Sequence, residues 1–440
     1  MTPVALLMAL SLNPSPQAPA TTRTQPKTYF VATTGSDTNP GSREEPFQTI
    51  QKGADSLGRG DTLVIQGGVY REYVALARSG AYFDRNLKIQ AAPGAEVVID
   101  GEGLTPSTPR QALFDTNGAD YLEIRGLTTR NSPVAGIVVR GSWRVRLEDC
   151  HTVNTARSGI LVDKAQDVVL QGCEVEKACL RGGEESISVK RSADVTVRQC
   201  HVHDTMHEGI DVKEGSRHVR VLNNHVHHVE RQGLYADAWD SHTYDIRFEG
   251  NRVHDCMMGL AACTESGGLL QDVWFVNNVI YDCKGPGMIL AKWGHQEMRH
   301  DIRDVYFLNN TVVNCGNGGK DGVWGGSMLL ENDQAENVWV MNNIFSGSPQ
   351  DQMRVRHFDL APKNMEVRNN LVGGPSERFG RGNLYTTPRF VDPARKDFRL
   401  HPESPGIDEG AKTPWGGTTD AAGTRRLQGK GIDIGAFETR

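Results

Sequence analysis

The chain has 440 residues, of which 48 are glycine and 20 are proline, and its formal net charge is −6. The glycine excess and the low charged fraction of 23% are typical of many short strands joined by tight turns, not of a helical bundle. The acidic balance argues against nucleic acid as a partner, since nucleic-acid binding needs a basic surface. Apolar runs fall short of the roughly 18 residues that a membrane-spanning helix requires, so no membrane span is expected. Eight cysteines are too few for a scaffold built on disulfides.

The first residues look like an export signal without a basic start. Residues 4–12 form a short apolar stretch, and Ala18-Pro19-Ala20 is a small-x-small cleavage site. We therefore expect residues 1–26 to be a signal peptide and Pro-rich leader, and the protein to be secreted or periplasmic. The alternative is a Pro-rich leader that is not a signal.

Two columns of similar residues recur along the chain at intervals of roughly 25 residues. The first is a short apolar segment whose opening residues are Gly136, Gly159, Ser186, Gly209, Gly233, Gly259, Gly287 and Ser327. The second consists of Cys150, Cys173, Cys200, Asn224, Asn251, Asn278, Asn310, Asn343 and Asn370. Each period holds two or three strands of three to five residues, and none has room for a crossover helix.

This pattern predicts an all-β solenoid in which each turn of the chain stacks on the previous one at about 4.8 Å. The Asn column should form a ladder of side-chain amides, as in stacked cross-β structures. Cys256, Cys283 and Cys315 form another column, close enough for a disulfide to be permitted, although packed free thiols are the preferred interpretation. A solenoid needs no partner to bury its core, so a monomer is expected.

The two ends of the chain differ from the repeats. Residues 46–57 carry Phe47, Ile50, Ala54 and Leu57 at helical spacing, which predicts an amphipathic helix that caps the first coil. The tail from Phe390 onward reads as short strands and turns, and we expect it to form a C-terminal cap. Residues 27–440 are thus a single domain.

The chain resembles the right-handed parallel β-helix proteins of the pectate-lyase superfamily. The resemblance rests on the opening Tyr29-Phe-Val-Ala-Thr-Thr-Gly-Ser-Asp37 and on the closing Asp397-Phe-Arg-Leu with Ser404-Pro-Gly-Ile-Asp408. It implies a single-stranded right-handed parallel β-helix of roughly ten coils. It implies much less about activity, because lyases, epimerases, hydrolases and adhesins share this scaffold.

Stacking also predicts where the polar side chains gather. In Gly209-Ile210-Asp211-Val212-Lys213 the apolar residues point inward, so Asp211 and Lys213 point outward. On the same face, charge is concentrated on three consecutive coils. These coils carry Glu185, Ser188 and Lys190; Glu208, Asp211 and Lys213; and Gln232, Tyr235 and Asp237, followed by Trp239 and Asp240. A solvated surface would scatter charge over all coils, so a functional site is favoured over surface salt bridges.

Such a cluster suits β-elimination on an acidic polysaccharide that contains uronates. A cation on the sugar carboxylate stabilises the charge that develops when the C5 proton leaves. Glu185, Glu208, Asp211, Asp237 and Asp240 offer the oxygen ligands that Ca²⁺ prefers. Lys213 or Lys190 is the candidate base, because two neighbouring ammonium groups disfavour each other's charge. Tyr235 is the candidate acid for the leaving oxygen.

Comparison with families supports the same residues. In the chondroitinase B and alginate lyase family a Glu precedes the Lys base by five residues, as in Glu185 to Lys190 and Glu208 to Lys213. The Asp cluster with a Lys is similar to that of calcium-dependent family 9 pectate lyases. Asp237-Ala-Trp-Asp240 is similar to the Asp-Pro-His-Asp of C5-epimerases but lacks the His. Candidate substrate-binding residues are Arg191, His207, Arg231, Trp239 and Lys292, with Trp293 and Glu265 nearby.

Three alternatives to a lyase remain open. A uronan C5-epimerase shares the proton abstraction, a glycoside hydrolase would use a carboxyl pair such as Asp211 with Asp237 or Glu265, and a non-catalytic protein would only bind glycan. His203, His227 and His254 form a separate column, interpreted as stacked surface residues in preference to a metal site.

Overall fold

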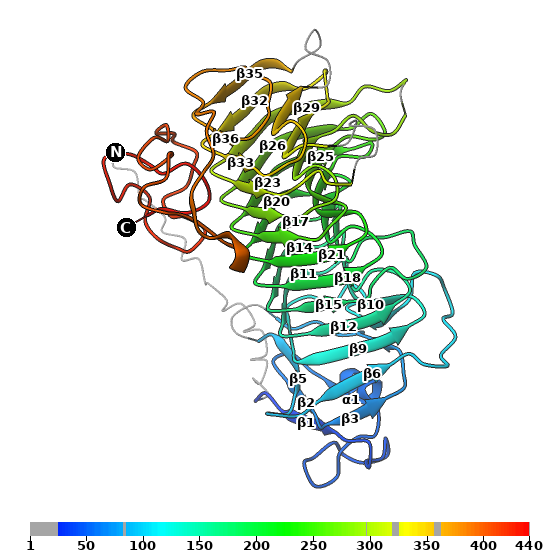
Figure 1. Cartoon of the computed structure of the whole chain (residues 1–440). Coiled ribbons are helices and arrows are strands. Elements are labelled where there is room, and N and C mark those ends of the chain that lie inside the picture. Colours follow the sequence, from blue (N-terminus) through cyan, green and yellow to red (C-terminus); the bar gives the residue numbers. More distant parts are fainter. Residues whose placement is uncertain (1–24, 82–84, 296, 319–324, 356–361, 440) are drawn as a thin grey trace, which may run out of the picture.

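The computed structural model describes residues 25–439, apart from 82–84, 296, 319–324 and 356–361, and the chain in it is a parallel β-helix (Figure 1). The predicted signal peptide lies almost wholly outside the described residues. Each coil contributes one strand to each of three parallel sheets, called here sheets A, B and C. They contain 13, 12 and 11 strands, so the expected number of about ten coils is close to the observed one.

Sheet A consists of β1 (Thr28–Val31), β2 (Thr62–Ile65), β5 (Leu87–Ala91), β8 (Leu122–Arg125), β11 (Trp143–Glu148), β14 (Gln166–Gln171), β17 (Ala193–Arg198), β20 (Arg217–Leu222), β23 (His242–Glu249), β26 (Leu269–Val276), β29 (Asp301–Leu308), β32 (Glu336–Met341) and β35 (Lys363–Arg368). Sheet B consists of β3 (Gly68–Tyr70), β6 (Val97–Asp100), β9 (Leu127–Ser132), β12 (His151–Thr155), β15 (Glu174–Glu176), β18 (His201–Thr205), β21 (His225–Val229), β24 (Arg252–His254), β27 (Val279–Tyr281), β30 (Thr311–Val313), β33 (Ile344–Ser346) and β36 (Leu371–Gly373). Sheet C consists of β4 (Val74–Ala75), β7 (Ala112–Asp115), β10 (Ala135–Arg140), β13 (Ile160–Asp163), β16 (Ile187–Lys190), β19 (Ile210–Lys213), β22 (Gln232–Asp237), β25 (Met258–Cys263), β28 (Met288–Leu290), β31 (Met328–Leu330) and β34 (Met353–Val355).

The core is a set of aliphatic and aromatic stacks inside the coil. Ile137, Ile160, Ile187, Ile210 and Leu234 are register partners on successive strands of sheet C, and all are fully buried. Identical neighbours along the coil axis keep the same side-chain volume on every level, which lets the levels stack without voids. The predicted register is therefore confirmed.

The predicted Asn ladder runs along the turn between sheets A and B. The Asn224 side-chain amide donates to Oδ1 of Asn251 at 2.9 Å, and Asn251 donates in the same way to Asn278 at 3.0 Å. The ladder continues through Asn310, Asn343 and Asn370. Each rung satisfies buried backbone groups of the turn, so the polar column is stable inside the fold.

The cysteines of the described chain extend these columns as free, buried thiols. Cys150, Cys173 and Cys200 continue the ladder position toward the N-terminus, where they replace Asn. Packed free thiols, the interpretation preferred from the sequence, match this structure.

The N-terminal helix is shorter than predicted. It is α1 (Ile50–Ser56), and Thr49 caps it by accepting a hydrogen bond from the Lys52 amide. Residues 46–48 stay outside the helix because they run alongside β1, where Phe47 bridges to Val31. Ile50 and Ala54 are buried in the main core at the first coils, so the helix covers that end as expected.

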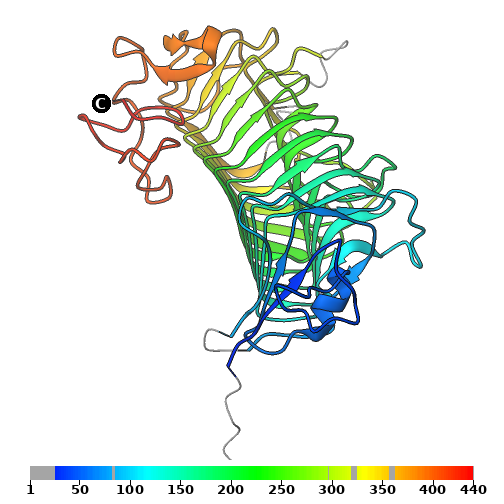
Figure 2. The ribbon, with the colours of Figure 1, turned by 90° about the horizontal axis from the view of Figure 1, so that it is seen from below.

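The C-terminal tail corrects the sequence-based interpretation. Its β37 (Phe390–Asp392), 3-10 helix η2 (Pro393–Arg395) and β38 (Asp397–Leu400) pack against the flank of the coil and do not lie across its end (Figure 2). Phe398 and Ala436 form an apolar cluster with Tyr281 of β27 and Val313 of β30. The outer face of these strands is apolar, and the tail supplies its cover. In the described part of the chain, no helix is long and apolar enough to cross a membrane.

Candidate active site on sheet C

The register of sheet C brings the predicted polar residues together. Asp211 lies between Ser188 of β16 and Tyr235 of β22, and Lys213 is the partner of Lys190. The outward direction expected for these side chains holds, but loops cover the face, so Asp211 is only 1% exposed. The site is thus a largely buried polar cluster instead of an open charged surface.

Lys213 is the centre of this cluster. Its Nζ lies 2.5 Å from Oε1 of Glu185 and 3.5 Å from Oδ2 of Asp211. Burial lowers the pKa of Lys213, but the two carboxylates outweigh this and raise it above its usual value. Burial likewise raises the pKa of Glu185, and Lys213 with the Ser188 hydroxyl brings it below the ordinary value. Lys213 is therefore a firmly held cation in this arrangement.

The remaining carboxylates have less compensation. Burial raises the pKa of Asp211 well above its ordinary value, and its Oδ1 has no hydrogen-bond partner among the described residues. Burial raises the pKa of Asp237 from 3.8 to about 7, although Oδ1 accepts a hydrogen bond from the Trp239 amide at 2.9 Å. A carboxyl that titrates near neutrality is unusual, and such groups cluster at functional sites.

Tyr235 occupies the next place along the site. Its ring is buried against Ala261 and Ile289, and its hydroxyl donates to Oε1 of Glu265 at 2.6 Å. Burial raises the pKa of Tyr235 well above 10, so the hydroxyl keeps its proton. Glu265, named from the sequence only as a residue of the same groove, is therefore the group that orients Tyr235.

Glu208 forms the edge of the cluster. It is buried, its Oε1 accepts a hydrogen bond from the Arg231 guanidinium at 2.9 Å, and His207 Nδ1 lies 3.7 Å from its other oxygen. Arg231 is more than half exposed, so the positive charge faces solvent while the carboxylate is inside. These three predicted residues are thus neighbours.

A basic pocket of about 370 Å³ adjoins the cluster. It lies over the ends of β10, β13 and β16, where Arg140, Asp163 and Lys190 stand one above another. Six basic and three acidic residues line it: Arg110, Arg140, Arg157, Lys164, Lys190 and Arg191, with Asp163, Glu184 and Glu214. Among the described residues, the ammonium groups of Lys164 and Lys190 have no carboxylate partner. Because Lys190 pairs in register with Lys213, the pocket and the cluster share one surface.

Some predicted residues lie apart from the buried cluster. Asp240 is exposed in the turn after β22 and contacts Ser241, and Trp239 beside it is 42% exposed. Lys292 pairs with Asp333 at 2.6 Å, farther along the coil. Arg191 pairs with Asp163 at 2.8 Å and Glu214 at 3.3 Å inside the basic pocket.

Sequence reasoning missed several residues of that pocket. Arg140 stood in the outward column but was not singled out, whereas Arg157 and Lys164 lie at turns where alternation gives no direction. Arg110 comes from residues 101–111, an insertion outside the repeat, so no column could place it. The signal that existed was the alternation of basic and acidic residues at the end of each strand of sheet C.

The donor chemistry of the cluster fits a hard cation such as Ca²⁺. Asp211 and Asp237 are buried carboxylates with incomplete compensation, and Ca²⁺ prefers carboxylate and carbonyl oxygens. The oxygens are not yet gathered, however. In the described part of the chain, sets of three ligand atoms within 4.8 Å of one another occur only around His201 on sheet B. A cation on sheet C would therefore have to draw the carboxylates closer or take further oxygens from a ligand.

Comparison with known proteins agrees with the coil. The family model "Right handed beta helix region" matches residues 135–312, and the model "Pel9A-like, right handed beta helix region" matches residues 29–178. The uncharacterized protein YwoF of Bacillus subtilis is 24% identical over 86% of this chain and 91% of its own length. Pectate lyase PEL9 of Emericella nidulans is 28% identical over 32% of this chain and 37% of its own length.

Solved structures show the same fold. The structure of pectate lyase Pel9A covers 95% of this chain and 97% of its own, with a TM-score of 0.57 and 14% identity. A family 28 exopolygalacturonase of Yersinia enterocolitica covers 86% of this chain and 80% of its own, with a TM-score of 0.59 and 14% identity. The chain is a right-handed parallel β-helix protein of the pectate-lyase superfamily. Its relatives of known activity are enzymes that act on polysaccharides, lyases as well as hydrolases.

Proposed function

We propose that this protein is a secreted lyase that cleaves an acidic, uronate-containing polysaccharide by Ca²⁺-assisted β-elimination. The observation that carries the proposal is the position of Lys213. It lies among three buried carboxylates, Glu185, Asp211 and Asp237, and it adjoins a pocket rich in Lys and Arg. Pectate lyases among the similar proteins support the same class of substrate.

The basic pocket accounts for the charge of the substrate. Arg guanidinium groups pair well with planar carboxylates, and ammonium groups such as Lys164 and Lys190 attract them as point charges. A polymer with one carboxylate on each sugar would place neighbouring carboxylates along the coil axis. A neutral polymer would leave the two unpartnered ammonium groups without a counter-charge.

Lys213 is the proposed base. It takes the C5 proton on Nζ, the electrons of the C5–H bond form the C4–C5 double bond, and the C4–O bond breaks. This requires an unprotonated Lys213, which Glu185 and Asp211 oppose as the cluster stands. Lys190 faces the pocket and is assigned to binding the substrate carboxylate, so its loss should affect KM more than kcat.

Ca²⁺ would be held by Glu185, Asp211 and Asp237, with Glu208 and Asp240 at the edge. When bound, it supplies positive charge that offsets the pull of these carboxylates on Lys213 and stabilises the charge that develops on the sugar carboxylate. The unpartnered Oδ1 of Asp211 is the atom that supports this assignment most directly.

Tyr235 is the proposed acid for the leaving oxygen. An alkoxide is far more basic than a phenolate, so a buried tyrosine with a raised pKa is still able to give it a proton. The 2.6 Å hydrogen bond to Glu265 fixes the direction of the hydroxyl. Arg231 and His207 hold Glu208, while Trp239 and Lys292 are proposed to contact sugar units farther from the cleavage point.

A second candidate is a glycoside hydrolase. Asp237, with a pKa of about 7, would hold a proton at neutral pH as a general acid, and Asp211 would serve as its partner. The fold is shared with a polygalacturonase, which is compatible with this chemistry.

One digestion experiment separates the candidates. Pectate, alginate and chondroitin are incubated with the protein in Ca²⁺ and in EDTA, and the ultraviolet absorbance of unsaturated uronates is followed together with reducing ends. A lyase raises both in Ca²⁺, a hydrolase raises reducing ends alone, and an epimerase changes only the sugar NMR spectrum. Lys213→Ala should abolish the absorbance, whereas Lys363→Ala, an exposed lysine of β35, should not. No change with any polyuronate would refute the proposal.

Export and a monomeric state are part of the same proposal. N-terminal sequencing of protein recovered outside the cytoplasm should begin at or after residue 21. Light scattering should give the mass of one chain.

A further inference from the structure

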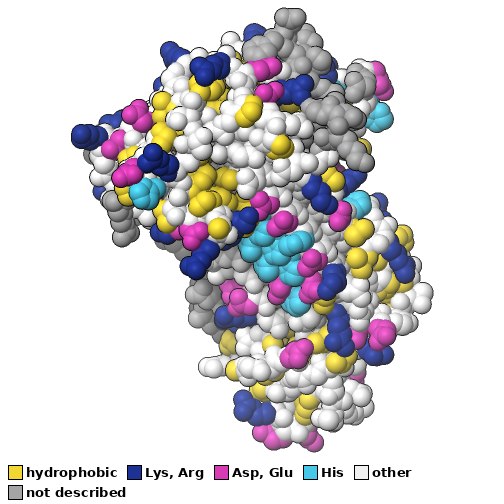
Figure 3. Space-filling model, viewed as in Figure 1, with side chains coloured by type: hydrophobic (Ala, Val, Ile, Leu, Met, Phe, Trp, Pro, Cys, Tyr) yellow, Lys and Arg dark blue, Asp and Glu magenta, His cyan; other side chains and the backbone are white. Residues whose placement is uncertain are grey.

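Histidines form a continuous patch on the outer face of sheet B, away from the polar cluster of sheet C (Figure 3). The patch comprises His201 and His203 of β18, His225, His227 and His228 on β21, and His254 of β24. The chain has 14 histidines in all, so nearly half of them lie on three neighbouring strands. The column of His203, His227 and His254 expected from the sequence is confirmed as stacked and largely buried.

The rings are arranged in two parallel rows. His201 stacks on His225 with ring centroids 5.0 Å apart, and His203 stacks on His227 at 5.2 Å. The second row continues from His227 to His254 at 4.9 Å and ends on Tyr281. The register of the strands fixes the spacing of the rings, so the donor atoms are held in place by the coil and not by flexible loops.

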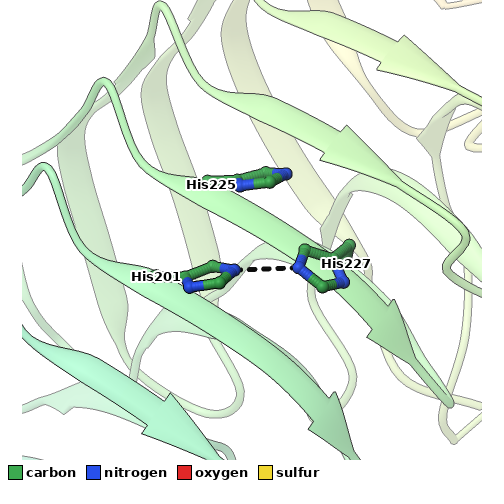
Figure 4. A group of neighbouring side chains, drawn as sticks. All are labelled: His201, His225 and His227. Carbon is green, nitrogen blue, oxygen red and sulfur yellow. Dashed lines mark hydrogen bonds between the residues drawn. The ribbon is translucent and has the colours of Figure 1, made fainter. Parts of the chain in front are cut away.

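Nitrogen atoms of the two rows point at each other across the groove between them. Nε2 of His201 lies 2.8 Å from Nε2 of His227, and Nε2 of His225 lies 2.8 Å from Nε2 of His254 (Figure 4). One ring nitrogen each of His201, His225 and His227 lie within 4.8 Å of one another. Glu174, His201 and His203 form a second group of this kind that shares His201.

We propose that this patch binds a divalent transition-metal ion of the Zn²⁺ type, with His201, His225 and His227 as ligands and Glu174 beside them. Imidazole nitrogen suits Zn²⁺, Cu²⁺ and Ni²⁺, whereas the carboxylate cluster of sheet C suits Ca²⁺. Tetrahedral Zn²⁺ with Zn–N of about 2.0–2.1 Å spaces its nitrogens by roughly 3.3 Å, so His201 and His227 need to separate by only about 0.5 Å.

The surroundings favour a neutral, ligating form of these rings. Burial, together with the neighbouring imidazoles, lowers the pKa of His225 to about 3 and of His227 to about 4. Both are then free of their second proton at neutral pH, as metal ligands must be. Carboxylates lie next to the outer rings: Asp204 contacts Nδ1 of His203 and Asp255 contacts Nδ1 of His254, both at 2.7 Å. Such contacts fix ring orientation and favour a positive ion nearby.

The inference is independent of the proposed lyase activity. The site lies on a different sheet, and its donors are nitrogen atoms. A metal ion held by β18 and β21 would connect two successive coils and so stabilise the middle of the solenoid.

The test uses tag-free full-length protein, stripped of metal and titrated with Zn²⁺ against a chromophoric chelator. We expect one ion per chain with a dissociation constant in the micromolar range or below. The variant His201→Gln/His227→Gln should weaken binding at least about 100-fold. His218→Asn is the matched control, because His218 is an exposed histidine of sheet A at a left-handed φ of 54° that Asn tolerates, and it should bind as the wild type does.

A measurement on the wild type keeps the proposal testable if the double variant does not fold. In a ¹⁵N spectrum of the histidine side chains, Zn²⁺ should shift the ring nitrogens of the patch and leave His218 and His401 unchanged. Wild-type protein that binds no Zn²⁺ at 100 µM would overturn the proposal. So would a folded double variant that binds as tightly as the wild type, or Zn²⁺ shifts confined to histidines outside the patch.

Discussion

Asp237 provides a sharp test of the site, because its substitution should stabilise the protein while it removes activity. Asn keeps the hydrogen bond that Oδ1 of Asp237 accepts from the Trp239 amide, but it carries no charge. The buried carboxylate is an energetic cost of the folded state when it is ionised. Asp237→Asn removes that cost together with a proposed cation ligand and acid.

The magnitude follows from the pKa of about 7 in the folded protein against 3.8 for an ordinary Asp. The folded state binds the proton more tightly, so stability is greatest below about pH 4 and falls as the pH rises through 7. At about 1.4 kcal/mol per pKa unit, the full loss is about 4 kcal/mol above pH 7, and about half of it is present near pH 5.5. Asp237→Asn should recover these amounts.

The assay is chemical denaturation of both proteins in EDTA at about pH 5.5 and pH 8. We expect the gain in unfolding free energy to be larger at the higher pH by about 2 kcal/mol. Asp240→Asn, an exposed neighbour, should change little at either pH. A variant that is less stable than the wild type at both pH values, or a gain that does not depend on pH, would refute the assignment of Asp237 as a strained buried carboxyl.

Three further predictions address neighbouring features. Lys213→Ala should cost about 3–5 kcal/mol, because it leaves Glu185 buried without its cation, and adding Glu185→Gln should recover a large part; denaturation midpoints check this, and no recovery would contradict it. Asn278→Ala removes four side-chain hydrogen bonds of the ladder and should lower stability by about 3 kcal/mol in the same assay, whereas a neutral effect would show that the ladder contributes nothing. Arg140→Ala should raise KM for a polyuronate and weaken the salt dependence of binding without changing kcat, and an unchanged KM would remove the pocket from the binding site.

Most of the fold could be predicted from the sequence because a solenoid repeats its own constraints. Asn278 and Gly209 each recur at equivalent places on many coils, and one consistent register satisfies all of them. The tail could not be placed in this way. Phe398 and Ala436 belong to no repeat, and only the apolar outer face of Tyr281 and Val313 shows where they pack.

The candidate site was predicted in composition but not in electrostatics. Alternation along β19 placed Asp211 and Lys213 on one face, yet it carried no information on how deeply covering loops bury them. Two stacked lysines suggested mutual depression of their pKa values. In the structure Lys213 turns to Glu185 and Asp211 while Lys190 faces the pocket, so the carboxylates determine the charge of Lys213. Side-chain direction at strand ends and turns decides this, and periodicity does not encode it.

A crystal structure of Lys213→Ala soaked with Ca²⁺ and an oligouronide would test the central claim most directly. We predict sugar carboxylates against Arg140 and Lys190 in the basic pocket, with one C5 atom over the place vacated by the Lys213 side chain and Ca²⁺ at Asp211. An oligosaccharide bound on another sheet, with the surface of β16, β19 and β22 empty, would contradict the claim.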